Sequence, residues 1–206
     1  MKKMKKINFK TSITAFVLFL FLITGLATSC KKSTCNYTPC TVRDSINIST
    51  GLADSSRIDP NWIVTSSPYP AGTPALTTPS YIPFWQPTPL AVTNAGWINC
   101  TGTVFTNSIG NYTFERSFTI APGTISFSCD FGISYDDTLV SLDIISPTPT
   151  TTPLTHTASG YNVSPNIGTV FTSPTPGVWK IRATVTFIDN VGGFLTSGYI
   201  KVLRPC

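Results

Sequence analysis

The chain has 206 residues and a formal net charge of +5, and only 11% of its residues are charged. The excess positive charge lies entirely in five lysines before residue 11, because residues 30–206 carry nine basic and nine acidic side chains. A neutral remainder lacks the basic footprint of a nucleic-acid-binding protein, so we expect no nucleic-acid partner. Scarce charge combined with 17 prolines and many Thr and Ser residues is typical of an extracellular β-protein rather than a cytosolic enzyme.

The first 29 residues have the features of a bacterial lipoprotein signal peptide. A lysine-rich start precedes an apolar segment, residues 13–27, that is too short to span a membrane comfortably. Small residues then lead to Cys30. An ordinary signal peptide with an incidental cysteine and an uncleaved anchor are the alternatives. We predict that residues 1–29 are removed and that Cys30 carries a lipid. Residues 30–40 would then tether the protein to the bacterial cell envelope, at the outer membrane, facing the periplasm or the cell surface.

Residues 41–206 are long enough for one domain with its own hydrophobic core. Short strands are expected around Ile46 and Ile48, at residues 62–64, 97–100 and 103–106. Seven prolines in residues 68–89 predict a loop that cannot be a central strand. Three longer runs then alternate apolar and polar residues: residues 112–120, 140–144 and 181–188. A turn at residues 189–193 predicts a hairpin into a last strand, residues 194–203.

In the middle run, Val140, Leu142 and Ile144 are expected on the buried face, since side chains two residues apart share one face of a strand. No part of residues 30–206 has the period of an amphipathic helix. The pattern therefore predicts an all-β fold, an antiparallel β-sandwich, in a single domain over residues 41–206.

Six segments occur in a characteristic order. They are residues 49–51 (STG), 59–62 (DPNW), 97–98 (WI), 110–120 (GNYTFERSFTI), 135–144 (YDDTLVSLDI) and 184–200 (TVTFIDNVGGFLTSGYI). The ordered set, over roughly residues 44–203, resembles the galactose-binding-like jelly-roll domain of secreted bacterial proteins. The resemblance implies a jelly-roll sandwich used for carbohydrate binding, adhesion or display, and it implies no reaction. The chain departs from the family at residues 145–147, where members often have an Asn-Gly turn.

Aromatic residues fall into two groups. Those in the strand-like runs are expected in the core: Trp62, Trp97, Phe114, Phe118, Phe127 and Phe187. Tyr81, Phe84 and Trp85 instead lie between prolines, where their flat faces are suited to stacking on sugar rings. The alternative is that they fold back as a lid over the edge of the sandwich, because an exposed apolar cluster is costly.

Residue types for catalysis are sparse, and we expect no enzyme. His156 is the only imidazole and lies in a Thr- and Pro-rich segment, while Glu115 is the only glutamate and is expected on the solvated face of a strand. Asp136 and Asp137 are more typical of a turn than of a metal site. A structural calcium ion there is the alternative, and no other cofactor or metal is expected.

Arg116 shares the alternation of Phe114 and Phe118, so its guanidinium should point toward the core or its margin. An unpaired charge there is costly, which predicts an ion pair with Asp130, Asp136 or Asp137.

The cysteines predict disulfide bonds formed after export. Cys100 and Cys129 are a plausible pair between strands. Cys206 is expected to pair with Cys35 or Cys40 if the first and last strands lie side by side.

Two classes of function remain: a glycan-binding envelope lipoprotein, and a structural or adhesive protein that contacts other proteins without a small ligand.

Overall fold

Alternating apolar and polar side chains form strands along more than half of the described chain. The structure, a computed structural model, describes residues 40–52, 56–78, 95–103, 105–157, 160 and 167–206. These residues form eleven β-strands and no helix, so none of them belongs to a helix that could span a membrane. The strands are β1 (Thr41–Asn47), β2 (Ile58–Ser66), β3 (Pro74–Thr77), β4 (Ile98–Asn99), β5 (Gly110–Ile120), β6 (Ser126–Asp136), β7 (Thr138–Ile145), β8 (Thr151–Pro153), β9 (Val170–Thr172), β10 (Gly177–Phe187) and β11 (Gly193–Pro205).

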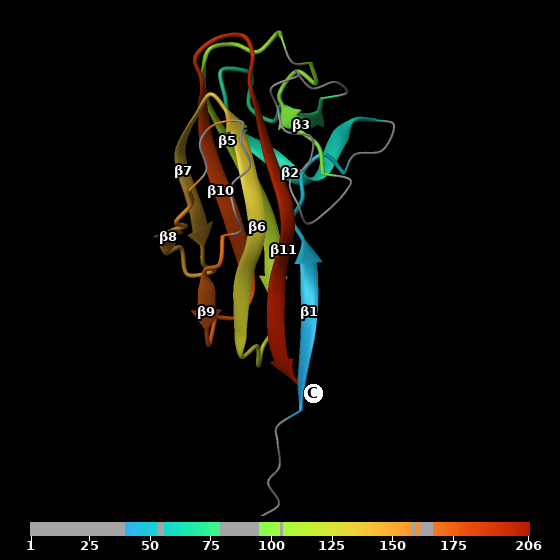
Figure 1. Cartoon of the computed structure of the whole chain (residues 1–206), viewed down its shortest axis with the longest axis vertical. Helices are drawn as coiled ribbons and strands as arrows, with labels where there is room; N and C mark the ends of the chain where they lie inside the picture. The colour runs from blue at the N-terminus through green and yellow to red at the C-terminus, as the bar shows by residue number, and fades with distance from the viewer. Residues whose placement is uncertain (1–39, 53–55, 79–94, 104, 158–159, 161–166) are drawn as a thin grey trace, which may run out of the picture. The chain divides into compact units, whose positions relative to one another are not determined.

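All strand pairs are antiparallel and belong to one continuous, curled sheet, which confirms the all-β, antiparallel prediction. The order is β8-β7-β10-β5-β2-β3-β4-β11-β6-β9, and β1 pairs with the free side of β11. One half, β7, β10, β5 and β2, lies behind the other half, β1, β11 and β6 (Figure 1). The short strands β3 and β4 connect the two halves.

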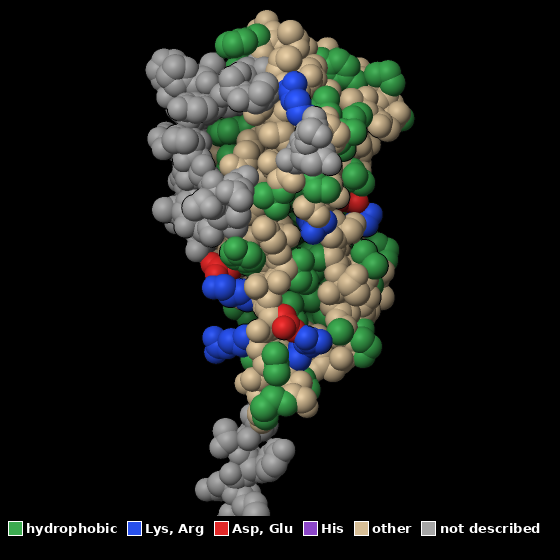
Figure 2. Space-filling view, turned by 90° about the vertical axis from the view of Figure 1, so that its right-hand side faces the viewer, with side chains coloured by type: hydrophobic (Ala, Val, Ile, Leu, Met, Phe, Trp, Pro, Cys, Tyr) green, Lys and Arg blue, Asp and Glu red, His purple; other side chains and the backbone are tan. Residues whose placement is uncertain are grey.

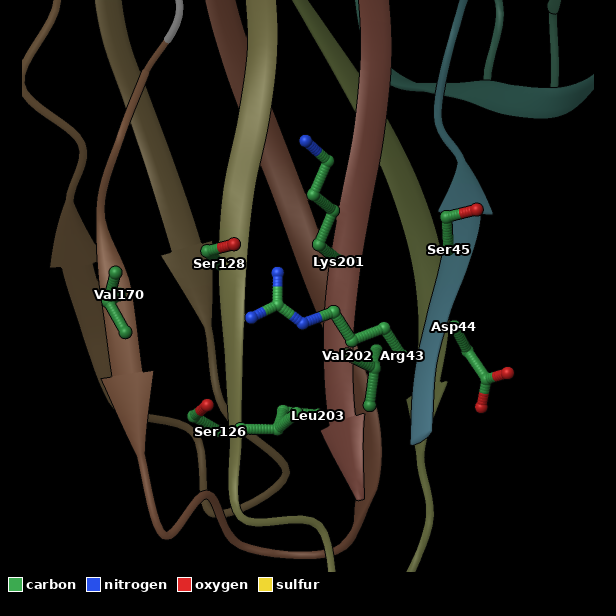
Figure 3. A pocket seen from close by; sticks show the side chains of 9 residues that line it. All are labelled: Arg43, Asp44, Ser45, Ser126, Ser128, Val170, Lys201, Val202 and Leu203. Atoms are coloured by element: carbon green, nitrogen blue, oxygen red, sulfur yellow. The ribbon is translucent and has the colours of Figure 1, made fainter. Parts of the chain in front are cut away.

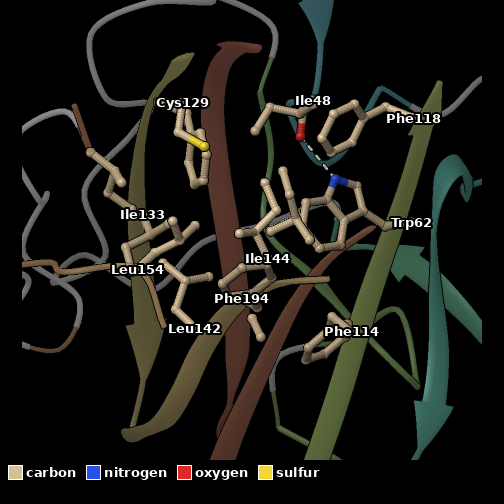
Figure 4. Packing of buried hydrophobic residues seen from close by; sticks show 14 of the residues in the cluster. Ile48, Trp62, Phe114, Phe118, Cys129, Ile133, Leu142, Ile144, Leu154 and Phe194 are labelled. Carbon is tan, nitrogen blue, oxygen red and sulfur yellow. Dashed lines mark hydrogen bonds between the residues drawn. The ribbon is translucent and has the colours of Figure 1, made fainter. Parts of the chain in front are cut away.

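Aromatic side chains from both halves meet in the core between them. Trp62 of β2 packs edge-on against Phe194 of β11, with ring centroids 5.4 Å apart. Its indole Nε1 donates a hydrogen bond of 2.9 Å to the carbonyl oxygen of Ile48 (Figure 4). Phe127 of β6 contacts both Phe118 of β5, at 5.7 Å, and Trp179 of β10, at 5.0 Å. These contacts across the sheet hold its two halves together, because aromatic burial dominates the energetics of such cores.

The sequence pattern predicted most of this core correctly. The inward side of β10 is fully buried, with Ile181, Ala183, Val185 and Phe187 each 0% exposed. The six aromatics expected in the core are all buried as well, although Trp97 lies in a separate small cluster with Leu195.

Val140 departs from its predicted position, since its side chain is 58% exposed. The register explains the difference: Ser141 pairs with Thr184 and Leu139 pairs with Val185, so Val140 is an extra residue on β7. Such a β-bulge turns the following side chain to the opposite face. Leu142 and Ile144, beyond the bulge, are buried as predicted.

Three other segments differ from their predicted structure. The proline-rich segment contains β3, which begins at Pro74 and pairs with both β2 and β4. Proline is tolerated there because it occupies the first position of the strand.

Residues 189–193 do not form a hairpin, because β10 pairs with β5 and β7 whereas β11 pairs with β6, β1 and β4. They cross between the halves instead. No strand occurs among the described residues of 103–106.

One of the two predicted disulfides is confirmed, because Cys206 pairs with Cys40, one of its two expected partners, and the other is not. Cys40 and Cys206 form a disulfide with their Cα atoms 5.3 Å apart, at the end where β1 and β11 run side by side. Cys100 and Cys129 are free and buried, so their predicted bond is wrong. Ile98, two residues before Cys100, pairs with Phe194, whereas Cys129 pairs with Ile200. Six residues of β11 separate these positions by roughly 20 Å, and a disulfide bridges less than about 7 Å.

Candidate functional site

The outer face of the half-sheet formed by β1, β11, β6 and β9 carries a shallow groove of about 440 Å³ near the disulfide end. The inner faces of these strands bury residues such as Phe127, Cys129, Ile200 and Val202. Because side chains alternate along a strand, the residues between them must project outward. The groove is lined by Arg43, Asp44, Ser45, Ser126, Ser128, Val170, Lys201, Val202 and Leu203.

The register arranges the outward side chains in two rows across the sheet. In one row Ser45, Lys201, Ser128 and Val170 lie on neighbouring strands. In the next row Arg43 and Ser126 lie on either side of Leu203. The two rows thus combine the hydroxyls of three serines, two cationic side chains and the aliphatic side chains of Val170 and Leu203. This mixture suits a ligand with both hydroxyls and a C–H surface.

The two cations of the groove differ in their partners. Lys201 forms an ion pair with Asp130, two residues along β6 from Ser128. Arg43 makes no hydrogen bond or ion pair with any described residue, and its guanidinium extends across β11 toward β6 (Figure 3). Asp44 points away from the groove and pairs with Arg204 on the other face of β1 and β11. The groove therefore has one positive charge that the surrounding carboxylates do not balance.

Charged side chains on the face seen in Figure 2 are few, and some of them lie beside a side chain of opposite sign. The strongest group lies on the other half of the sheet. The carboxylate of Glu115 on β5 forms ion pairs with Lys180 at 2.7 Å and Arg182 at 2.8 Å, both from β10. Its side chain is only 3% exposed, which corrects the prediction of a solvated residue. The two long cationic side chains cover it, since their aliphatic parts can lie along the sheet.

The electrostatic balance at Glu115 favours the ionised carboxylate. Burial alone would raise its pKa, but hydrogen bonds and charge from Lys180 and Arg182 outweigh burial, so the pKa is lowered. Each cationic partner is about two-fifths exposed. This group stabilises the pairing of β5 with β10.

Arg116 is half-buried on the core side of β5, as predicted, but its partners differ. Its guanidinium donates to the carbonyl oxygens of Asn61 at 3.4 Å and Asn47 at 3.3 Å. Burial lowers its pKa, and the charge of Asp59 opposes that effect. None of Asp130, Asp136 or Asp137 forms an ion pair with it. The prediction missed Asp59 because β2 and β5 are neighbours only in the folded sheet.

Asp136 is the last residue of β6, where it pairs with Gly193, and Asp137 is the single residue between β6 and β7. The carboxylate of Asp137 accepts a hydrogen bond of 2.7 Å from the backbone nitrogen of Ile188, and Asp136 is buried. No group of three potential metal ligands occurs among the described residues. The predicted lipid site, Cys30, and the predicted stacking residues, Tyr81, Phe84 and Trp85, lie outside the described residues.

Sequence reasoning did not find the groove. Arg43 and Ser45 lie between the expected tether, residues 30–40, and the strand expected around Ile46, whereas Lys201 lies in the expected last strand, residues 194–203. The alternating polar residues in segments 41–47 and 199–205 could have indicated these outward side chains. The sequence of a single segment does not, however, determine which strands are neighbours in the sheet.

The end of the sheet opposite the disulfide carries exposed apolar side chains. Phe105 is 59% exposed, Ile109 is 68% exposed and Ile188 is 63% exposed. They are neighbours, since Asn190 donates a hydrogen bond to the carbonyl of Phe105 and Gly110 pairs with Phe187. We call these three residues the apolar tip. Figure 2 shows hydrophobic side chains at the surface of this end.

Comparison of the chain with protein-family models, with curated proteins and with solved structures gives no match. The groove and the tip must therefore be interpreted from their own chemistry.

Proposed function

We propose that this chain is a non-catalytic lipoprotein of the bacterial cell envelope whose β-domain binds carbohydrate. The groove on the outer face of β1, β11, β6 and β9 carries this proposal. It presents the hydroxyls of Ser126 and Ser128 and the cations Arg43 and Lys201 beside the aliphatic side chain of Leu203. A volume of about 440 Å³ is within the range of small-ligand sites and suits one or two sugar units.

The rest of the proposal comes from the sequence. The lysine-rich, apolar and small-residue segment before Cys30 supports a lipid anchor at the outer membrane. The ordered segments that resemble a galactose-binding-like domain support a jelly-roll sandwich. The connections from β5 to β6, from β6 to β7 and from β10 to β11, which cross between the two halves of the sheet, are compatible with that class.

Glycan-array binding of the purified full chain in detergent tests carbohydrate binding, with the double variant Ser126→Ala/Ser128→Ala as the site variant. Both serines are partly exposed on the outer face, so the change should leave thermal unfolding unaltered. The variant should lose binding to the sugars that the wild type retains. A matched control, Thr113→Ala, alters a hydroxyl on the outer face of the other half. Wild-type protein that binds no array member contradicts the proposal.

The anchor has a separate test. Changing Cys30 to Ser should release the protein from the membrane fraction, because the lipid would have no attachment site. Retention of this variant in the membrane after cleavage elsewhere contradicts the lipoprotein assignment.

Adhesion to another protein is the second candidate, and the apolar tip favours it. Three large apolar side chains together on one end are typical of a protein contact. Replacing Ile109 and Ile188 by Ser should abolish cell–cell or cell–surface adhesion while glycan binding persists. Unchanged adhesion of cells that display this variant contradicts the second candidate.

A further inference from the structure

The described part of the chain contains seven Lys or Arg side chains, and six of them have partners within the protein. Carbonyl oxygens bind Arg57 and Arg116, and carboxylates bind the other four: Lys180, Arg182, Lys201 and Arg204. Arg43 is the one cation of these seven that has no partner among the described residues. It is also the cation whose guanidinium lies over the groove (Figure 3).

The position of Arg43 suits recognition of an anion. Its guanidinium is planar and presents a fork of N–H donors that matches two oxygens of one oxyanion. It belongs to the same row as Leu203 and Ser126 and extends toward Ser128 in the adjacent row. Lys201, already paired with Asp130, adds its charge to the neighbouring row without being free for the ligand.

We propose that the ligand is an acidic saccharide, whose carboxylate or sulfate group binds Arg43 while its ring hydroxyls contact Ser126 and Ser128. This inference rests on the proposed carbohydrate function and specifies its ligand class. The aliphatic side chains of Leu203 and Val170 offer the C–H face of the ring an apolar surface. A neutral sugar would leave the Arg43 guanidinium without a partner and so would bind more weakly.

The test compares four ligands with the purified full chain in detergent. They are an oligogalacturonate, its neutral methyl ester, a sulfated galactose oligosaccharide and a neutral galactose oligosaccharide. The methyl ester differs from its parent only in charge, so it isolates the contribution of the carboxylate. Polyglutamate, an anion without sugar rings, is the fifth probe.

Two variants accompany the wild type. Arg43→Gln removes the free cation, and binding of the best acidic oligosaccharide should weaken by roughly tenfold or more, the loss of one charge-assisted contact. Arg204→Gln is the matched control, because it changes the net charge equally on the same strand pair but on the opposite face. It should bind as the wild type does. Binding by the wild type should also weaken as salt is raised, since an exposed ion pair is screened.

The outcomes separate the two proposals. Acidic ligands bound in an Arg43-dependent manner, with their neutral counterparts bound more weakly, support the inference. Equal binding of neutral and acidic sugars, or equal affinities of wild type and Arg43→Gln, overturns it while carbohydrate binding stands. Polyglutamate bound as tightly as the acidic sugars also overturns it. If none of these oligosaccharides binds but another sugar binds on the glycan array, only this inference fails, and if no array member binds either, both proposals fail.

Discussion

Removing the disulfide between Cys40 and Cys206 should lower the stability of the domain by several kcal/mol. The bond joins residues 166 positions apart, so it closes nearly the whole domain into one loop. Its main effect is on the unfolded chain, whose conformational freedom it restricts. The perturbation is the double substitution Cys40→Ser/Cys206→Ser, which removes the bond without leaving a lone thiol.

The chain-entropy relation gives the size of the effect. For a closed loop of 166 residues it predicts about 5 kcal/mol at 25 °C. Measured values commonly fall below this limit, because the unfolded reference state retains some structure. The expected loss in the free energy of unfolding is therefore about 2–5 kcal/mol.

The assay is urea unfolding of residues 40–206, followed by tryptophan fluorescence, since Trp62, Trp97 and Trp179 are buried. Adding a reductant should lower the midpoint of the wild type to that of the double variant and leave the variant unchanged. The two free cysteines should not interfere. Burial raises the pKa of Cys100 to about 11, with a hydrogen bond from Ser67 opposing it, and burial raises the pKa of Cys129 to about 12. Both therefore remain unreactive thiols at neutral pH.

Equal midpoints for the oxidised wild type and the double variant would refute this reasoning. A reductant that shifts the double variant as much as the wild type would refute it too, because the effect would then come from other groups.

Three further changes test other parts of the fold. Glu115→Gln should destabilise the protein at pH 7 by about 1–3 kcal/mol. Because the pKa of Glu115 is lowered on folding from about 4.5, its stabilisation is complete above that pH and is lost as the pH falls through the folded pKa, so urea midpoints of variant and wild type should converge as the pH is lowered below 4.5. Trp62→Phe should cost about 0.5–1.5 kcal/mol in the same assay, since it removes the indole donor and leaves the buried carbonyl of Ile48 with the hydroxyl of Thr196 alone; an unchanged midpoint would contradict this. Gly198→Ala should cost about 2–4 kcal/mol, because φ is +147° and the added Cβ would overlap the carbonyl of Asp130; a thermal melt equal to that of the wild type would show that the backbone relaxes.

The strands of the core could be predicted from the sequence because burial imposes a period that each segment carries by itself. Ile181 to Phe187 is the clearest case, with every second residue apolar and fully buried. The period fails where the chain inserts a residue: the bulge at Val140 leaves no mark in the alternation of β7, since a valine is compatible with either face.

Contacts between distant segments could not be predicted in this way. Asp59 acts on Arg116, and Lys180 covers Glu115, only because β5 lies between β2 and β10. The order of strands in a sheet depends on the summed packing of whole strands, so it is not encoded in the residues that finally meet. The groove has the same origin, because Arg43 and Ser128 are brought together only by the place of β11 between β1 and β6.

The disulfide also determines how the domain would respond to a mechanical load applied from its N-terminal side. Pulled at residue 40 alone, β1 would peel from β11 one residue pair at a time, which needs little force. The bond at Cys206 instead passes the load to the end of β11. That strand pairs with β6 from Gly193 to Leu203, so a lengthwise pull would shear all of these pairs together. A pulling force on the domain would then leave β1 paired with β11.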